Sequence, residues 1–279
     1  MIEAIRITDF EHPDLAPYRS MRMQSEHQAQ GIFVAEGEKV VRRLLESSLE
    51  VISVLLPTKW VQPYEPLLAT HPSKPKLFTA EKTLLEKLTG FSLYQGLLAV
   101  GKIPPPLSLP ELVKGQKTPA LLVAVEGISS AENMGALIRS CAAFGAQGLV
   151  VGESCCHPYL RRSVRASMGT IFNLPYLLSP NVGETLQELK REKIQAVAAD
   201  PKPHARVLNK ADFASAVCIV FGSEGAGISE STLAACDYAA QIPMQNEVDS
   251  LNVSSAAAAF LYEVWRQRSE LSSQRDKIS

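Results

Sequence analysis

Three segments in the second half of the chain carry polar side chains suited to chemistry on a bound substrate. The first contributes Asn133 and Arg139, the second Glu224, and the third Ser250 and Asn252. An arginine stays protonated in essentially any protein site, so it can hold an anion and stabilise developing negative charge. Each residue alone also fits a structural role. Asn133 lies where a helix cap would fall, Arg139 and Glu224 could be surface charges, and capping explains one of the residues in the third segment.

A glycine-rich turn surrounds Glu224. Gly222, Gly225 and Gly227 follow the apolar run 217–221. Glycine lets backbone amides approach a ligand closely and permits positive φ. The spacing matches neither the dinucleotide-binding fingerprint nor the phosphate-binding P-loop. An α/β enzyme acting on a small phosphorylated metabolite is therefore disfavoured, because it would need a recognisable phosphate loop.

The elements that must position these segments alternate between strands and helices. Apolar, β-rich runs predict the strands, and helical spacing of apolar residues predicts the helices. The predicted strands are 120–125, 148–151, 196–199, 217–221 and 238–242, and the predicted helices are 134–144, 184–192 and 253–268. This alternation is typical of an α/β fold with a parallel sheet covered on both faces. Ligands of such sheets bind at the carboxyl ends of the strands, where the glycine-rich turn is expected.

A proline-rich segment divides the chain. Prolines cannot donate ladder hydrogen bonds and favour extended chain, so we predict an interdomain linker over 104–119. A small α/β domain precedes it over 1–103. The larger α/β domain follows over 120–268, and a polar, frayed tail is expected over 269–279.

The composition sets the broad class of protein. The 279 residues are 46% hydrophobic and carry a net charge of −1, so no global basic field is present, and any nucleic-acid contact must be local. The sequence shows no secretory signal or long apolar run, which predicts a cytoplasmic protein without a membrane span. Five cysteines, mostly in apolar stretches, suit reduced thiols. Cys155, Cys156 and His157 lack further ligands at metal-binding spacing, so no metal site is expected.

Basic side chains gather in two places. A solvated helix face is as good an interpretation of the amino-terminal ones as an RNA-binding face. The densest cluster of the second domain is nominated for phosphate contacts. The candidates are Arg19, Arg22 and Lys39 in the first domain, and Arg161, Arg162 and Arg165 in the second.

Taken together, the three segments closely resemble the signature motifs of the SpoU-type (TrmH-like) RNA ribose 2′-O-methyltransferases of the SPOUT superfamily. The match covers most of 120–268 in the same order and spacing. Residues 165–175 resemble the family's linking motif between the first and second signatures. Residues 19–41 are similar to the RNA substrate-binding domain that many members carry at the amino terminus.

The resemblance implies a deep trefoil knot in the second domain and S-adenosylmethionine as the cofactor. Cofactor contacts would fall at Gly222, Ile242 and Leu251, with Met244 as a further wall of the adenine slot. The reaction it implies is methyl transfer to a ribose 2′-hydroxyl of RNA. The family uses the residues at the positions of Arg139, Glu224, Ser250 and Asn252 for this reaction.

The chemistry requires the 2′-oxygen to attack in line while its proton leaves and negative charge is stabilised. Because a guanidinium is a poor base, we expect Arg139 to hold the adjacent phosphate and stabilise the alkoxide. Glu224 would orient Arg139. Asn133, Ser250 and Asn252 would position the ribose and hold the loops.

The chain departs from the family at Asn246, where members commonly carry glycine. Asparagine is the non-glycine residue most tolerant of left-handed backbone, so the turn is expected to survive. The resemblance also implies a homodimer that uses the closing helix. Ribosomal RNA is favoured over transfer RNA by analogy. A non-catalytic RNA-binding or assembly factor that retains the fold is the alternative from another class.

Overall fold

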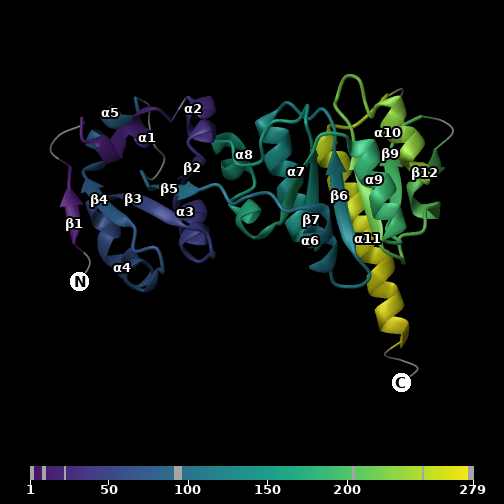
Figure 1. The fold of residues 1–279 in the computed structure, drawn as a ribbon, viewed down its shortest axis with the longest axis horizontal. Coiled ribbons are helices and arrows are strands. Elements are labelled where there is room, and N and C mark those ends of the chain that lie inside the picture. Colours follow the sequence, from purple (N-terminus) through teal and green to yellow (C-terminus); the bar gives the residue numbers. More distant parts are fainter. Residues whose placement is uncertain are drawn as a thin grey trace. The chain divides into compact units, whose positions relative to one another are not determined.

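Two units make up the chain, which we describe from a computed structural model at residues 3–7, 11–21, 23–90, 96–202, 205–246 and 248–275. The first unit comprises Met1–Pro105 and Pro158–Asn173, and the second comprises Pro106–His157 and Leu174–Ser279. Figure 1 labels the elements of both. The first break falls inside the predicted linker. The division differs from the predicted domain 120–268 in one place, since 158–173 belongs to the first unit.

A five-stranded mixed sheet forms the first unit, in the order β1-β4-β3-β5-β2. β1, β4 and β3 run parallel, and β5 is antiparallel to both β3 and β2. The strands are β1 (Ala4–Arg6), β2 (Ile32–Glu36), β3 (Val51–Pro57), β4 (Lys76–Ala80) and β5 (Leu98–Lys102). The helices from this part of the sequence are α1 (Ala16–Arg19), α2 (Gln24–Ala29), α3 (Glu38–Leu45), α4 (Val61–Thr70) and α5 (Lys82–Thr89).

A segment from the second half of the sequence completes the first unit. It contains α8 (Arg161–Ala166) and a 3-10 turn over Thr170–Asn173. The Phe33 ring on β2 contacts Tyr159 at a centroid distance of 5.1 Å and Phe172 at 5.4 Å. All three rings are buried. Burial of this aromatic cluster explains why the segment leaves its sequence neighbours and packs on β2.

Seven parallel strands form the second unit, in the order β10-β12-β9-β11-β6-β7-β8. The strands are β6 (Leu121–Val125), β7 (Gly148–Gly152), β8 (Tyr176–Ser179), β9 (Gln195–Ala199), β10 (Arg206–Val207), β11 (Val217–Phe221) and β12 (Tyr238–Gln241). The helices are α6 (Leu109–Lys114), α7 (Ala131–Ala143), α9 (Val182–Arg191), α10 (Glu230–Ala235) and α11 (Val253–Arg275). The predicted α/β class is confirmed. The trefoil knot stays a prediction.

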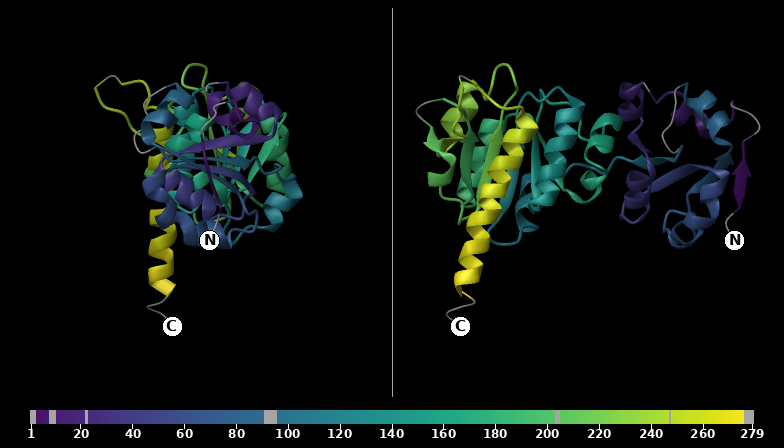
Figure 2. Two further views of the ribbon diagram at one scale, coloured as in Figure 1. Left: turned by 90° about the vertical axis from the view of Figure 1, so that its left-hand side faces the viewer. Right: turned by 180° about the vertical axis from the view of Figure 1, so that it is seen from behind.

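Helices cover both faces of this sheet. Leu112 of α6, Leu186 of α9 and Ala235 of α10 share one buried cluster with the strands. On the opposite face, the ring of Phe260 in α11 meets Phe221 of β11 at 5.7 Å. Figure 2 shows α11 lying along that face. Strands that are buried on both faces require continuous apolar runs, which is the composition of β6 and β11.

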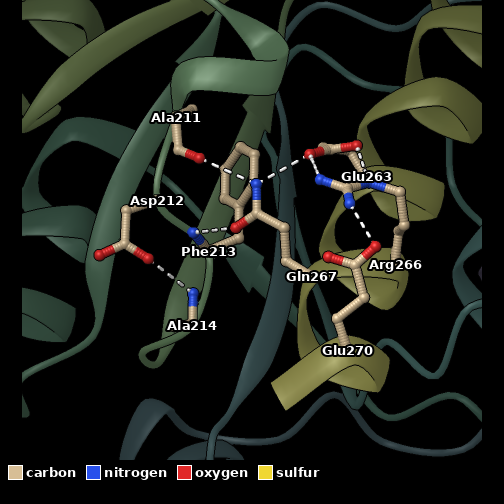
Figure 3. A network of polar contacts seen from close by, with 8 residues as sticks. All are labelled: Ala211, Asp212, Phe213, Ala214, Glu263, Arg266, Gln267 and Glu270. Atoms are coloured by element: carbon tan, nitrogen blue, oxygen red, sulfur yellow. Dashed lines mark hydrogen bonds and ion pairs between the residues drawn. The ribbon is translucent and has the colours of Figure 1, made fainter. Parts of the chain in front are cut away.

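The far end of α11 is fastened to the segments that precede the strands. Gln267 Nε2 donates to the Ala211 oxygen at 2.9 Å, and the Phe213 nitrogen donates to Gln267 Oε1 at 2.9 Å (Figure 3). The Arg268 guanidinium donates to four backbone carbonyl oxygens, those of Pro119, Ala120, Phe213 and Ser215. These contacts hold α11 across the whole length of the strands.

Two predicted boundaries are corrected. Residues 109–114 of the predicted linker form α6, whose amino end is stabilised by a capping box between Ser108 and Glu111 and whose Leu112 is buried. Proline is well tolerated in the first turn of a helix, so Pro110 does not prevent it. Residues 269–275 of the predicted tail continue α11. Within the described residues, none of the helices combines the length and apolarity that a membrane span requires.

Candidate active site

The three segments singled out in the sequence meet at the carboxyl edge of the parallel sheet. β6 and β11 are neighbours, and at their ends the Glu126 nitrogen donates to the Phe221 oxygen at 2.9 Å. β12 lies two strands from β11, across β9, and its following loop leads into the amino end of α11. Residues far apart in sequence therefore face one region.

The glycine-rich turn after β11 folds tightly on itself. Ser223 and Gly227 exchange backbone hydrogen bonds of 3.0 and 3.1 Å. A Cβ at Gly222 would stand 2.2 Å from the carbonyl carbon of Gly227, so no other residue fits there without moving backbone. Gly227 has a φ of +71°, in the region that favours glycine. Two of the three glycines are thus required by the shape of the turn.

One residue from each segment joins a polar cluster beside this turn. Glu224 Oε1 accepts from Asn133 Nδ2 at 2.7 Å and from Asn252 Nδ2 at 2.6 Å. Asn252 Nδ2 also donates to Asn133 Oδ1 at 3.0 Å. Ser254 donates twice to Asn252 Oδ1, from its backbone nitrogen at 2.9 Å and its hydroxyl at 2.6 Å. Because both bonds from Ser254 go to Oδ1, they fix the Asn252 amide with its Nδ2 toward Glu224.

Asn133 does not cap its helix. The cap of α7 is Ser130, whose hydroxyl accepts from the Asn133 nitrogen at 3.3 Å. Asn133 is the third residue of the helix, and its side chain is free to reach Glu224. The helix-cap interpretation of Asn133 is therefore wrong.

Arg139 lies on an exposed face of α7, six residues beyond Asn133. Six residues advance a helix by about 9 Å. In the part of the chain that the structure describes, no hydrogen bond or ion pair involves the Arg139 side chain. Glu224 Oε1 is held by two amides, and no contact between Glu224 and Arg139 is present among the described residues, so the orientation of Arg139 by Glu224 stays a prediction.

A pocket of about 490 Å³ opens beside the cluster. Its walls come from the ends of β9, β11 and β12 and from the start of α11. All four predicted cofactor residues line it, as do two of the predicted catalytic residues: Gly222, Ile242, Met244 and Leu251, with Glu224 and Ser250. Asn133, Arg139 and Asn252 are outside its lining. The pocket has the size of a small-molecule or cofactor site.

Asn246 has a φ of +56°. The loop therefore uses the left-handed backbone for which the family's glycine is suited, and asparagine sustains it.

Two residues that sequence reasoning did not single out also support the site. Glu126 accepts from the Ser229 nitrogen at 2.8 Å, the Ser229 hydroxyl at 3.0 Å and the Thr232 hydroxyl at 2.9 Å, which ties the first segment to α10. Asp200, directly after β9, lines the pocket. The only sequence signal for both was their position at the end of a predicted strand.

The nominated basic residues differ in their surroundings. Arg161 and Arg165 both pair with Glu36, whose side chain is 10% exposed, and the Arg161 side chain is itself only 12% exposed. These pairs lie within the first unit and fasten α8 to β2. Arg161 is thus committed to a buried ion pair, which argues against its nomination for phosphate contacts.

The other basic residues remain predicted RNA contacts. Arg162 and Lys39 are exposed, and Arg19 donates to the His12 oxygen at 3.3 Å. Arg22 lies outside the described residues. No cluster of three or more His, Cys, Asp or Glu side chains in the described ranges could hold a metal ion.

The fold and the pocket define an α/β enzyme that binds its ligand at the carboxyl edge of a parallel sheet. The chain belongs to the SpoU rRNA Methylase family, whose model matches residues 120–262. The resemblance noted from the three segments is thereby confirmed.

Relatives match beyond the family region. A Mycobacterium tuberculosis H37Rv protein described as an uncharacterised tRNA/rRNA methyltransferase is 30% identical over 265 residues, covering 92% of this chain and 90% of the relative. The 23S rRNA (guanosine-2′-O-)-methyltransferase RlmB of Ralstonia nicotianae is 29% identical over 204 residues, covering 73% of this chain and 82% of the relative.

Solved structures agree with the fold. The SpoU methyltransferase AviRb from Streptomyces viridochromogenes, in complex with the cofactor AdoMet, superposes with a TM-score of 0.78 at 26% identity, over 91% of this chain and 99% of that one. A structure described as an RNA 2′-O ribose methyltransferase gives a TM-score of 0.75 at 27% identity, over 95% and 99% of the two chains.

Proposed function

We propose that this protein transfers a methyl group from S-adenosylmethionine to a ribose 2′-hydroxyl of RNA, with ribosomal RNA as the substrate. The observation that carries the proposal is the hydrogen-bonded cluster of Asn133, Glu224 and Asn252. It unites the three family signatures at the edge of a pocket that Glu224 itself lines. The methyltransferases among the relatives and solved structures support it.

The pocket residues fit S-adenosylmethionine. Gly222 packs directly on the backbone of Gly227, which requires the absence of a side chain and shapes the turn that lines the pocket. Ile242, Met244 and Leu251 offer an apolar wall suited to an adenine ring. These residues would hold the cofactor, which supplies an electrophilic methyl group when bound. Such a combination of apolar wall and few polar groups is typical of cofactor sites.

The side chains around the pocket would act on the RNA. Arg139, exposed and without a protein partner among the described residues, is available to bind the phosphate next to the target ribose and to stabilise the developing alkoxide. The proton of the 2′-hydroxyl would leave to a phosphate or to water. Glu224 and Asn252 would hold the loops, with Asn133 and Ser250 beside the ribose.

Ribosomal RNA is preferred over transfer RNA as the substrate. The name of the Ralstonia relative supports this choice, and the match to that protein extends well beyond the family region. The first unit would bind the RNA outside the reacting nucleotide, and its exposed Arg162 and Lys39 are candidates for phosphate contacts. We also propose that the protein acts in the cytoplasm. Its five free cysteines support this location, because thiols stay reduced there.

We further propose that the protein works as a homodimer through α11. Tyr262 is 49% exposed and Trp265 is 50% exposed on one stretch of this helix. Their rings lie 5.8 Å apart, and Tyr262 also meets Phe144, beside the end of α7, at 6.1 Å. Exposed aromatic clusters are typical of protein interfaces. A symmetric dimer buries the same patch on both copies.

The test is a methyl-transfer assay with labelled S-adenosylmethionine on ribosomal RNA and transfer RNA, naked and assembled, followed by mapping of 2′-O-methylated positions. Label at one ribose of ribosomal RNA is expected. Label at transfer RNA alone would contradict the substrate, and label on a base would contradict the reaction. Binding of RNA and cofactor without transfer to any of these substrates would favour a non-catalytic factor.

A further inference from the structure

A carboxylate is buried at the centre of the pocket wall. Asp200 follows β9 directly and is 7% exposed, although it lines the pocket. Its backbone nitrogen donates to the Ala240 oxygen of β12 at 3.0 Å, which fixes its position against the neighbouring strand. The backbone of Asp200 is therefore held at the carboxyl edge of the sheet, where the residue lines the pocket.

One oxygen of this carboxylate has no hydrogen-bond donor. Oδ1 accepts from the Lys202 nitrogen at 3.2 Å, whereas Oδ2 is buried and lacks a hydrogen-bond partner among the described residues. The Lys202 ammonium lies 3.8 Å from Oδ2, beyond hydrogen-bond distance. That side chain is 58% exposed, so solvent screens its charge.

This arrangement destabilises the folded protein when no ligand is bound. A buried carboxylate oxygen without a donor pays its desolvation without compensation, and folded proteins satisfy nearly all such atoms. Unsatisfied atoms of this kind that persist in a pocket are explained when a bound molecule supplies the donor. S-adenosylmethionine carries its donors at the adenine amino group, the two ribose hydroxyls and the α-ammonium group.

The strand order points to one of these donors. β9 lies between β12 and β11 in the sheet. The loop after β12 contributes the apolar wall with Ile242 and Met244, and the turn after β11 contributes Gly222 and Glu224 beside the polar cluster. Asp200 therefore stands between the part of the pocket suited to the base and the part nearest the RNA-reactive residues. In the cofactor, the ribose connects these two ends.

We propose that Asp200 Oδ2 accepts a hydrogen bond from a ribose hydroxyl of the bound cofactor, which makes Asp200 a cofactor-binding residue. The inference rests on the proposed function for the identity of the cofactor. It does not depend on which RNA is methylated.

The experiment measures binding of S-adenosylhomocysteine by calorimetry, without RNA, to the full chain and to Asp200→Asn. Asparagine keeps an oxygen for the Lys202 nitrogen and presents an amide donor where Oδ2 stood. We expect affinity to fall by about 10- to 100-fold, the loss typical of a hydrogen bond to a charged group. Glu188→Gln is the control, because it removes an exposed carboxylate on α9, outside the pocket lining, and should change affinity less than about threefold.

Deoxyribose derivatives of S-adenosylhomocysteine identify the donor. The wild type should bind the 2′-deoxy or the 3′-deoxy derivative more weakly than the parent, and Asp200→Asn should cause no further loss with that derivative. A loss on Asp200→Asn that is equal for the parent and both derivatives would overturn the assignment to the ribose. Equal affinity of wild type and Asp200→Asn for the parent would overturn the proposal altogether.

Thermal unfolding of the ligand-free proteins separates binding from a structural role. Removal of a poorly compensated buried charge should leave the melting temperature of Asp200→Asn unchanged or raised. A melting temperature lowered by several degrees would instead assign Asp200 to the fold. Wild type that binds S-adenosylhomocysteine but methylates no RNA refutes only the proposed reaction, whereas wild type that fails to bind it refutes both proposals.

Discussion

Asn252 Nδ2 donates to Glu224 Oε1 at 2.6 Å, which joins the loop before α11 to the glycine-rich turn after β11. Both side chains are exposed, so neither is held by burial. Their shared partner Asn133 adds the first segment to the same cluster. The geometry of the candidate active site thus depends on a few polar contacts between loops.

Asn252→Ala should lower the rate of RNA methylation at saturating cofactor by about 10- to 100-fold, because Glu224 and Asn133 lose the amide that holds them together. Single-turnover methylation measures the effect. The control is Ser231→Ala on α10, which removes a hydroxyl that contacts Ser229 and should keep the wild-type rate. A wild-type rate in Asn252→Ala would mean that the cluster is dispensable.

Arg139→Ala should reduce methylation by about 100-fold or more while cofactor affinity stays the same, because Arg139 lies outside the pocket lining. Rates on the mapped RNA and calorimetric cofactor binding are compared in parallel. The control is Arg191→Ala. Arg191 is an exposed residue of α9, so this change removes an equal charge from the other face of the sheet and should have no effect. Equal losses of activity in both variants would mean that the net charge of the protein matters, and not the position of Arg139.

Trp265→Glu should convert a dimer to a monomer in analytical ultracentrifugation, since a charge would be buried in the aromatic patch on α11. Leu178→Glu places the same charge at another exposed apolar position, on β8, and should leave the mass unchanged. A wild type that sediments as a monomer would refute the proposed dimer.

Arg268→Met should lower the free energy of unfolding by roughly 2–4 kcal/mol, because four backbone carbonyls lose a charged donor. Urea unfolding measures the change. Arg191→Met is the control, because Arg191 is an exposed residue of α9, so little change is expected. Equal losses would show that the carbonyl contacts add nothing.

Stability should fall as the pH drops below about 6.5. Burial lowers the pKa of His27, His71 and His157 below the ordinary value of 6.5. The unfolded chain therefore binds protons at a pH where the folded protein does not, and the stability present above 6.5 is lost toward the lower folded-state pKa values. Urea unfolding at a series of pH values measures this slope. His27→Gln should flatten it, and an unchanged slope would exclude His27.

The fold class of the second unit and the place of its chemistry could both be predicted from the order of its amino acids. Uninterrupted apolar runs such as 121–125 and 217–221 can only be satisfied by burial on both faces, so they predict central parallel strands. Gly222 and Gly227 are required by the local backbone conformation of the turn, so they mark its place in the sequence directly. Order and spacing of the three segments then sufficed to identify the family.

Which side chains meet could not be predicted in this way, because it depends on contacts between distant segments. Asn133 and Glu224 are 91 residues apart, and Arg161 and Glu36 are 125 residues apart. Periodicity reports the face of an element that is buried, not the partner across a sheet edge. For the same reason, the return of 158–173 to the first unit and the unpartnered oxygen of Asp200 had no local signal. Both arise from packing between segments that are distant in sequence.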